Sequence, residues 1–300
     1  MNFLDAPKLG LNDWSNFILT IAFTILAFFV GQLPLVIIGV VNKDNFDGSV
    51  SAFIELVGTN SFFVLQLIPF LFAFVALLFA VNRIDKRPIL SVLTGRATFN
   101  WMRFFTSLII WTSVMVVSLL VSYFSSNEIG WNFQLDKFIP LMFISLIMVP
   151  IQSSCEEVFF RGYLLQYIAQ SSKRTWVAIL ITSIFFGLVH AGNPEVSILG
   201  YGILIYFILS GVFLAIIAVM DNGLELSMGY HAANNIFAAL ILTNDWKSFR
   251  TDALFIDHSA PTFSWESILT LLVFQPLMLF IFSRFYKWPS WKNLFFANNQ

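Results

Sequence analysis

The chain has 300 residues, of which 58% are hydrophobic and only 11% are charged. A soluble domain carries about 25% charged residues on its hydrated surface, so this composition and a mean hydropathy of +0.81 exclude an ordinary water-soluble protein. The net charge of −1 leaves no basic surface for nucleic acid. The single cysteine, Cys155, excludes an intramolecular disulfide framework and any CxxC metal site.

Long, continuous apolar runs follow one another along the chain. Such runs predict transmembrane helices, because a helix needs about 20 apolar residues to cross a bilayer and satisfies its own backbone there. The runs are Phe17–Val41, Ser61–Val81, Phe104–Phe124, Phe138–Ser154, Trp176–Val189, Val196–Met220, Leu224–Leu242 and Ile268–Ser283. The sequence therefore predicts an all-α, polytopic helical bundle of about eight transmembrane helices, forming one membrane domain over residues 1–300 in contact with the lipid bilayer.

The basic residues predict the orientation of these spans. With eight crossings, 12 of the 16 lysines and arginines fall on the side of the N-terminus. The remaining four are Lys43, Lys137, Lys247 and Arg250. Because basic residues concentrate on the cytoplasmic side of a membrane protein, we expect a multi-pass protein of the cell membrane with both termini in the cytoplasm.

Three polar clusters interrupt the middle spans. Their members are Glu156, Glu157 and Arg161; then His190; then His231 and Asn235. An ionisable side chain within the bilayer costs at least about 2.5–3.5 kcal/mol, so it indicates a partner or a function. Residues four apart share a helix face, which predicts a Glu157–Arg161 ion pair and places His231 beside Asn235. Glu156 points about 100° away around its helix and does not share Arg161.

The helices of Glu156 and His190 are joined by a polar turn at 171–174. In an antiparallel helical hairpin, residues at equal distances from the turn lie at equal depth. Positions 156 and 190 average to 173, the middle of that turn. Helical rise alone therefore predicts that Glu156 and His190 lie side by side.

Taken in order, Glu-Glu-x-x-x-Arg, Phe-x-x-x-His and His-x-x-x-Asn resemble the motifs of the CAAX-protease and bacteriocin-processing family, which includes the type II CAAX prenyl endopeptidases. The resemblance covers residues 138–242, which we expect to form the catalytic core. It implies an intramembrane endopeptidase. Its substrate would be a membrane-associated protein or peptide, of the prenylated CAAX type or another.

Peptide hydrolysis requires an activated water molecule, and Glu156 with His190 can hold and deprotonate one. His231 and Asn235 share a face from which they can donate hydrogen bonds to the tetrahedral oxyanion. The residues predicted to support these four without reacting are Glu157, Arg161 and Phe186, the last by packing one helical turn from His190.

A metal-dependent reaction is the alternative chemistry at this site. Glu156, His190 and His231 together make a plausible zinc ligand set. However, the HExxH spacing of soluble zinc proteases is absent. The family resemblance favours water activation without a metal, so we expect no required cofactor, and a divalent metal such as zinc is not favoured.

Two other classes of protein fit parts of the pattern. Glutamate and histidine inside a bundle also form the pathway of a proton- or ion-coupled transporter. Such transporters are often built from two related halves, but this sequence shows no pairing of two halves. A non-catalytic immunity or scaffold protein can adopt the same fold, but it has no need of all four predicted reacting residues. Endopeptidase activity is therefore the leading interpretation.

Overall fold

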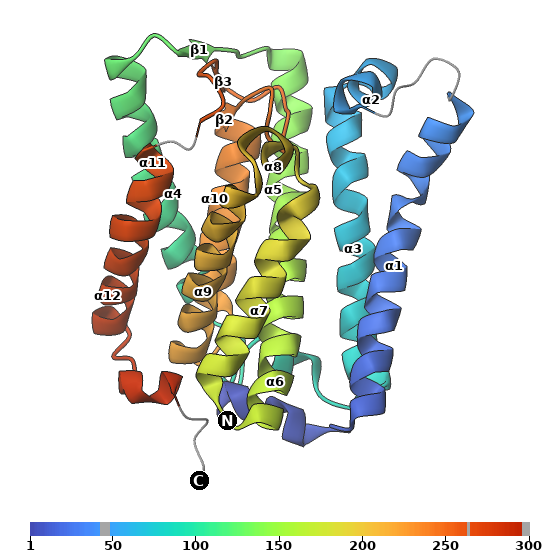
Figure 1. The fold of residues 1–300 in the computed structure, drawn as a ribbon, viewed down its shortest axis with the longest axis vertical. Helices are drawn as coiled ribbons and strands as arrows, with labels where there is room; N and C mark the ends of the chain where they lie inside the picture. The colour runs from blue at the N-terminus through green and yellow to red at the C-terminus, as the bar shows by residue number, and fades with distance from the viewer. Residues whose placement is uncertain (43–48, 263–264, 296–300) are drawn as a thin grey trace.

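The computed structural model of the protein describes residues 1–42, 49–262 and 265–295. Figure 1 shows a bundle of helices that run along one common direction. The α-helices are α1 (Trp14–Val41), α2 (Val50–Val57), α3 (Thr59–Arg83), α4 (Trp101–Ser125), α5 (Leu135–Glu157), α6 (Leu165–Ser172), α7 (Thr175–Val189), α8 (Pro194–Leu199), α9 (Leu204–Met220), α10 (Glu225–Ile236), α11 (Trp265–Leu269) and α12 (Gln275–Phe285). Three π-helical turns cover Val158–Leu164, Phe237–Ile241 and Thr270–Phe274. Short 3-10 helices cover Phe3–Leu9, Ile89–Val92, His190–Gly192, Tyr201–Ile203 and Trp291–Leu294.

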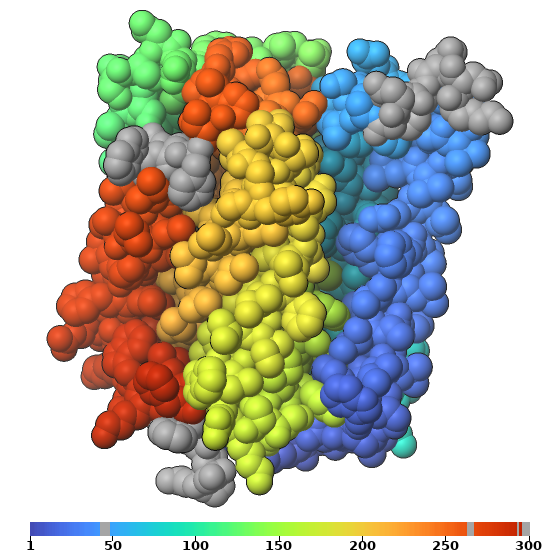
Figure 2. Space-filling view, viewed as in Figure 1, coloured from blue at the N-terminus to red at the C-terminus, as the bar shows by residue number. Residues whose placement is uncertain are grey.

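Seven helices in the described part of the chain are long and apolar enough to cross a membrane. They are Trp14–Val41, Thr59–Arg83, Trp101–Ser125, Leu135–Ser172, Thr175–Gly192, Tyr201–Met220 and Ser267–Phe285. Large apolar side chains cover their outer faces, for example Leu26 on α1, Leu188 on α7 and Phe280 on α12. These three helices form much of the face seen in Figure 2. The predicted all-α, multi-pass membrane bundle is confirmed.

One predicted boundary is wrong. The span predicted to end at Ser154 continues through α5, a π-helical turn and α6 as a single helical segment of 38 residues, Leu135–Ser172. Arg161 therefore lies inside this segment, fully buried, and is not one of the loop charges that determine orientation. A π-helical turn adds one residue to a helical turn and often marks a functional site.

Two further predicted spans differ from the structure. The run Val196–Met220 is broken at Gly200, whose φ of 78° is readily adopted only by glycine, so α8 and α9 are separate helices. The run Leu224–Leu242 forms α10 and the π-helical turn after it. This segment is not among the seven long apolar helices. It packs inside the bundle against α4, α5 and α9.

A small sheet that the sequence did not predict closes one end of the bundle (Figure 1). Its strands are β1 (Ile129–Trp131), β2 (Leu242–Thr243) and β3 (Phe255–Asp257), in the order β1-β3-β2. β1 pairs with β3 in antiparallel fashion, and β2 pairs with β3 in parallel. The sheet ties the chain after α4 to the chain after α10.

The opposite end of the bundle gathers both ends of the described chain (Figure 1). The Met1 amino group donates to the Gly95 carbonyl at 3.0 Å, and the Asn222 side chain donates to the Met1 carbonyl at 3.1 Å. Trp288 Nε1 donates to Asp221 at 2.9 Å. The segments predicted to be cytoplasmic therefore meet at one end. On the other predicted side, Lys43 lies outside the described residues.

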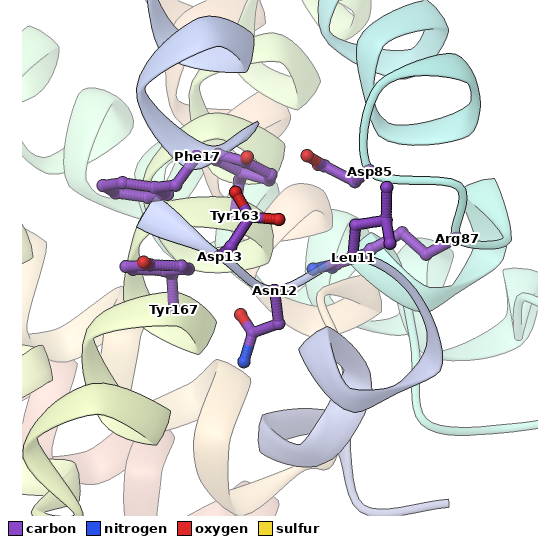
Figure 3. A pocket seen from close by; sticks show the side chains of 8 residues that line it. All are labelled: Leu11, Asn12, Asp13, Phe17, Asp85, Arg87, Tyr163 and Tyr167. Carbon is purple, nitrogen blue, oxygen red and sulfur yellow. The ribbon is translucent and has the colours of Figure 1, made fainter. Parts of the chain in front are cut away.

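A small polar pocket lies where α1 meets the loop after α3 and the helix of Tyr163 (Figure 3). Phe17 stacks on Tyr167 with ring centroids 3.7 Å apart. The buried Asp85 carboxylate accepts a hydrogen bond from Thr20 at 3.1 Å. Burial raises the pKa of Asp85 to about 6, and its hydrogen bonds and the charge of Arg87 oppose this effect only in part.

This pKa predicts a pH-dependent stability. The folded protein binds the Asp85 proton more tightly than the unfolded chain, whose pKa is 3.8. This group therefore lowers the free energy of unfolding as the pH rises from about 4 to above 6. We expect Asp85→Asn to raise the melting temperature relative to the native protein more at about pH 7.5 than at about pH 5. Thermal unfolding in detergent micelles measures this, and a difference that does not change with pH would contradict it.

Candidate active site

The structure builds the site around the buried carboxylate of Glu157, at the end of α5. Glu157 Oε1 accepts a hydrogen bond from Arg161 Nη1 at 2.9 Å, and both side chains are 0% exposed. This confirms the ion pair predicted from their spacing. Arg161 also donates to the Gly211 carbonyl of α9 at 3.4 Å, and its guanidinium lies 4.1 Å from the ring centroid of Phe186. The pair therefore connects α5, α7 and α9.

Glu157 has a second partner that the sequence did not reveal. His231 Nδ1 lies 2.9 Å from Glu157 Oε1. Because an ionised carboxylate only accepts hydrogen bonds, the Nδ1 atom carries the proton in this contact. The contact fixes the ring of His231 and directs its Nε2 atom away from Glu157. Glu157 thus orients His231 as well as neutralising Arg161.

Helix α10 brings His231 to this position by packing tightly against α4. A Cβ atom at Gly229 would lie far inside the contact distance of the Phe104 carbonyl oxygen. Only glycine allows this approach of the two backbones. Gly229 lies two residues before His231, so the small residue sets the depth at which the imidazole enters the bundle.

Glu156 lies beside this cluster and differs from its neighbour in exposure. Its side chain is 14% exposed, whereas that of Glu157 is 0% exposed. Glu156 Oε2 lies 3.7 Å from His231 Nε2, and Glu156 Oε1 accepts a hydrogen bond from Gln152 Nε2 at 2.6 Å. Of the two adjacent carboxylates, Glu156 is the one that solvent or a substrate can reach.

A chain of amide side chains extends from Glu156 toward α4. Asn235 Nδ2 donates to Gln152 Oε1 at 2.9 Å. Asn234 Nδ2 donates to Asn235 Oδ1 at 3.3 Å, and Trp111 Nε1 donates to Asn234 Oδ1 at 3.4 Å. The predicted residue Asn235 is therefore at the site, linked to Glu156 through Gln152. Sequence reasoning missed Gln152, although its spacing of four residues before Glu156 places both on one helix face.

His190 approaches the cluster from α7. Its Nδ1 atom lies 2.6 Å from the Phe186 carbonyl oxygen, and its ring stacks on Phe207 with centroids 4.3 Å apart. The Phe186 ring contacts both His190 and His231, with centroid distances of 4.7 and 6.1 Å. Among the described residues, no hydrogen bond or ion pair joins His190 to Glu156. Their sharing of one water molecule stays a prediction.

The alternative metal ligand set consists of Glu156, His190 and His231. Within the described ranges, no three His, Cys, Asp or Glu side chains form a group that could hold a metal ion. The set of Glu156, His190 and His231 is therefore not assembled as ligands in this structure. We derive no step through a metal.

The fold and the site define an integral, multi-pass membrane protein with a carboxylate–histidine centre inside its bundle. Residues 136–237 match the family model of the type II CAAX prenyl endopeptidases, Rce1-like. The chain is also 30% identical over 210 residues to an uncharacterized protein, YyaK, of Bacillus subtilis (strain 168), covering 68% of this chain and 69% of YyaK. No solved structure matches. The chain belongs to the Rce1-like family of type II CAAX prenyl endopeptidases, which is a family of membrane proteases.

The buried pair predicts a large loss of stability when one partner is removed. Arg161→Met leaves the Glu157 carboxylate buried beside His231 alone, which costs about 3–5 kcal/mol. Thermal unfolding in micelles measures the loss. The double variant Glu157→Gln with Arg161→Met removes both charges of this pair and should recover part of the lost stability. A single variant as stable as the native protein would show that the pair does not stabilise the bundle.

Proposed function

We propose that this protein is an intramembrane endopeptidase that hydrolyses a peptide bond of a membrane-associated protein or peptide. The observation that carries the proposal is the pairing of a partly exposed carboxylate with an oriented imidazole. Glu156 Oε2 and His231 Nε2 lie 3.7 Å apart. One oxygen atom can lie about 2.8 Å from both at once, so a water molecule that donates a hydrogen bond to Glu156 can lie beside His231 in the proposed site.

In the proposed reaction, Glu156 removes a proton from the bound water as its oxygen attacks the scissile carbonyl carbon. Negative charge then develops on the carbonyl oxygen. His231, with both nitrogens protonated, donates its Nε2–H to this oxyanion, and the second N–H of Asn235 is a further donor. Glu156 returns the proton to the leaving amine when the carbon–nitrogen bond breaks. Atoms and charge balance without a cofactor.

Each supporting residue has a defined place in this mechanism. Glu157 holds His231 in its orientation, and Arg161 balances the Glu157 charge. We propose His190 as the second residue that holds the water, because it lies directly after α7, one turn beyond Phe186. Phe186 packs against both imidazoles.

We also propose a substrate that comes from the membrane and a reaction that needs no metal. Family membership supports a substrate that reaches the site from the membrane, with CAAX-type prenylated proteins as one class. We propose that no metal is required, because His231 and Glu156 alone provide a base and a donor. A chelator added to the purified enzyme should leave the cleavage rate unchanged, and restoration of a lost rate by zinc would overturn this part.

Glu156→Gln provides the main test of the protease activity. The variant keeps the size and a hydrogen-bonding side chain but cannot accept the proton of water, so we expect the cleavage rate to fall by about 10²- to 10⁴-fold. Membrane peptides from cells with the native chain and with Glu156→Gln are compared by mass spectrometry, and the cleaved candidates are tested with purified protein. Cleavage products that persist unchanged in the variant would contradict the proposed protease activity.

We further propose that the end of the bundle holding both described chain ends faces the cytoplasm. Cys155 is buried, so a membrane-impermeant thiol reagent reports mainly on introduced cysteines. Arg174 and Asp245 are exposed. Arg174 lies in the turn between α6 and α7, and Asp245 follows β2, which lies at the opposite end of the bundle (Figure 1). In intact cells we expect labelling of Asp245→Cys and not of Arg174→Cys, with both labelled after lysis. The reverse pattern would invert the orientation.

A further inference from the structure

The hydrogen bonds from Trp111 to Glu156 run in one direction. An indole N–H can only donate, and an ionised carboxylate can only accept. Between these two ends lie Asn234, Asn235 and Gln152, each donating with its nitrogen and accepting with its oxygen. Turning any of the three amides would place two donors or two acceptors opposite each other. The ends of the chain therefore fix the orientation of every amide between them.

Gln152 is the member of this chain that touches the reactive carboxylate. It is 5% exposed, and both ends of its amide are engaged. Its Nε2 atom donates a hydrogen bond to Glu156 Oε1 at 2.6 Å, while Glu156 Oε2 faces His231. The last torsion of a glutamate side chain has only a broad preference. A donor on one oxygen is therefore what keeps the other oxygen directed at the imidazole.

We propose that Gln152 is a positioning residue for Glu156: its amide, itself held by Asn235, fixes the carboxylate so that Oε2 faces the site of reaction. This inference rests on the proposed function and adds a residue to it. It also gives Asn235 a second role, because one of its N–H groups orients Gln152 while the other stays available to the substrate.

Gln152→Leu removes the amide with little change in volume and tests the inference. A hydrogen bond to a charged group contributes enough for its loss to lower kcat by about 10- to 100-fold. KM should change little, because the proposed role of Gln152 is to hold Glu156 and not to bind the substrate. The acidic limb of the pH–rate profile should move to higher pH, because the ionised carboxylate has lost a donor that favours it. A purely structural role would not move this limb.

Gln166→Leu is the matched control. Gln166 is a fully buried glutamine on the same helical segment, with Arg87 and Ser91 as its partners at the end of the bundle. We expect this variant to lose thermal stability and to keep the pH profile of the native protein. If Gln152→Leu does not fold, Gln152→Glu keeps the side-chain size. It places a second carboxylate beside Glu156 and should move the acidic limb in the same direction.

Infrared spectroscopy does not depend on catalysis and therefore distinguishes the positioning role of Gln152 from the proposed protease function. The infrared carboxylate band of Glu156 is identified by its loss in Glu156→Gln. It should shift in Gln152→Leu and stay in place in Gln166→Leu. If the native chain cleaves peptides but neither the band nor the pH profile changes in folded Gln152 variants, the positioning role is wrong. If the band shifts while the native chain cleaves nothing, the proposed function fails and the positioning role stands.

Discussion

The compensation of one buried charge determines the architecture of this site. Glu157 is fully buried inside the bundle, where an unpaired carboxylate would cost several kcal/mol. Arg161 and His231 both contact its Oε1 atom. Through these partners and the neighbours of Arg161, a single carboxyl group connects α5, α7, α9 and α10. The pairing of this charge also holds the imidazole of His231, so the proposed catalytic geometry and the stability of the fold depend on the same contacts.

Two adjacent glutamates have different environments because of their rotation around one helix. Glu157 points toward Arg161, one turn further along, and is enclosed by protein. Glu156, about 100° away, keeps partial exposure and an amide partner instead of a cation. A carboxylate paired with arginine is a poor base, since its negative charge is already compensated. The helix thus gives two residues of the same type different environments, and the partly exposed carboxylate is the one that we propose as the base.

The parts of this structure that depend on local spacing could be predicted from the sequence. The long apolar helices and the Glu157–Arg161 pair follow from runs and periodicity within one segment. The contact between His231 and Glu157 joins residues 74 positions apart, and its formation depends on how closely α10 approaches α4 at Gly229. The three strands have only two or three residues each, too few for an alternating pattern. Gln152 shows the intermediate case, since its spacing to Glu156 is local but its orientation depends on Asn235 from another helix.

Both histidines of the site are anchored in the same way. His231 is held through Nδ1 by the Glu157 carboxylate, and His190 through Nδ1 by the Phe186 carbonyl. Anchoring of one ring nitrogen fixes the orientation of the ring, so each imidazole has only its Nε2 atom left for chemistry. Because the Nε2 atom of His231 faces Glu156 while the His190 ring stacks on Phe207 and contacts Phe186 at a tilt, the two imidazoles are not equivalent. The Glu156–His231 pair is in direct contact and is the centre of the site that we propose, whereas His190 and His231 share the Phe186 ring as a neighbour.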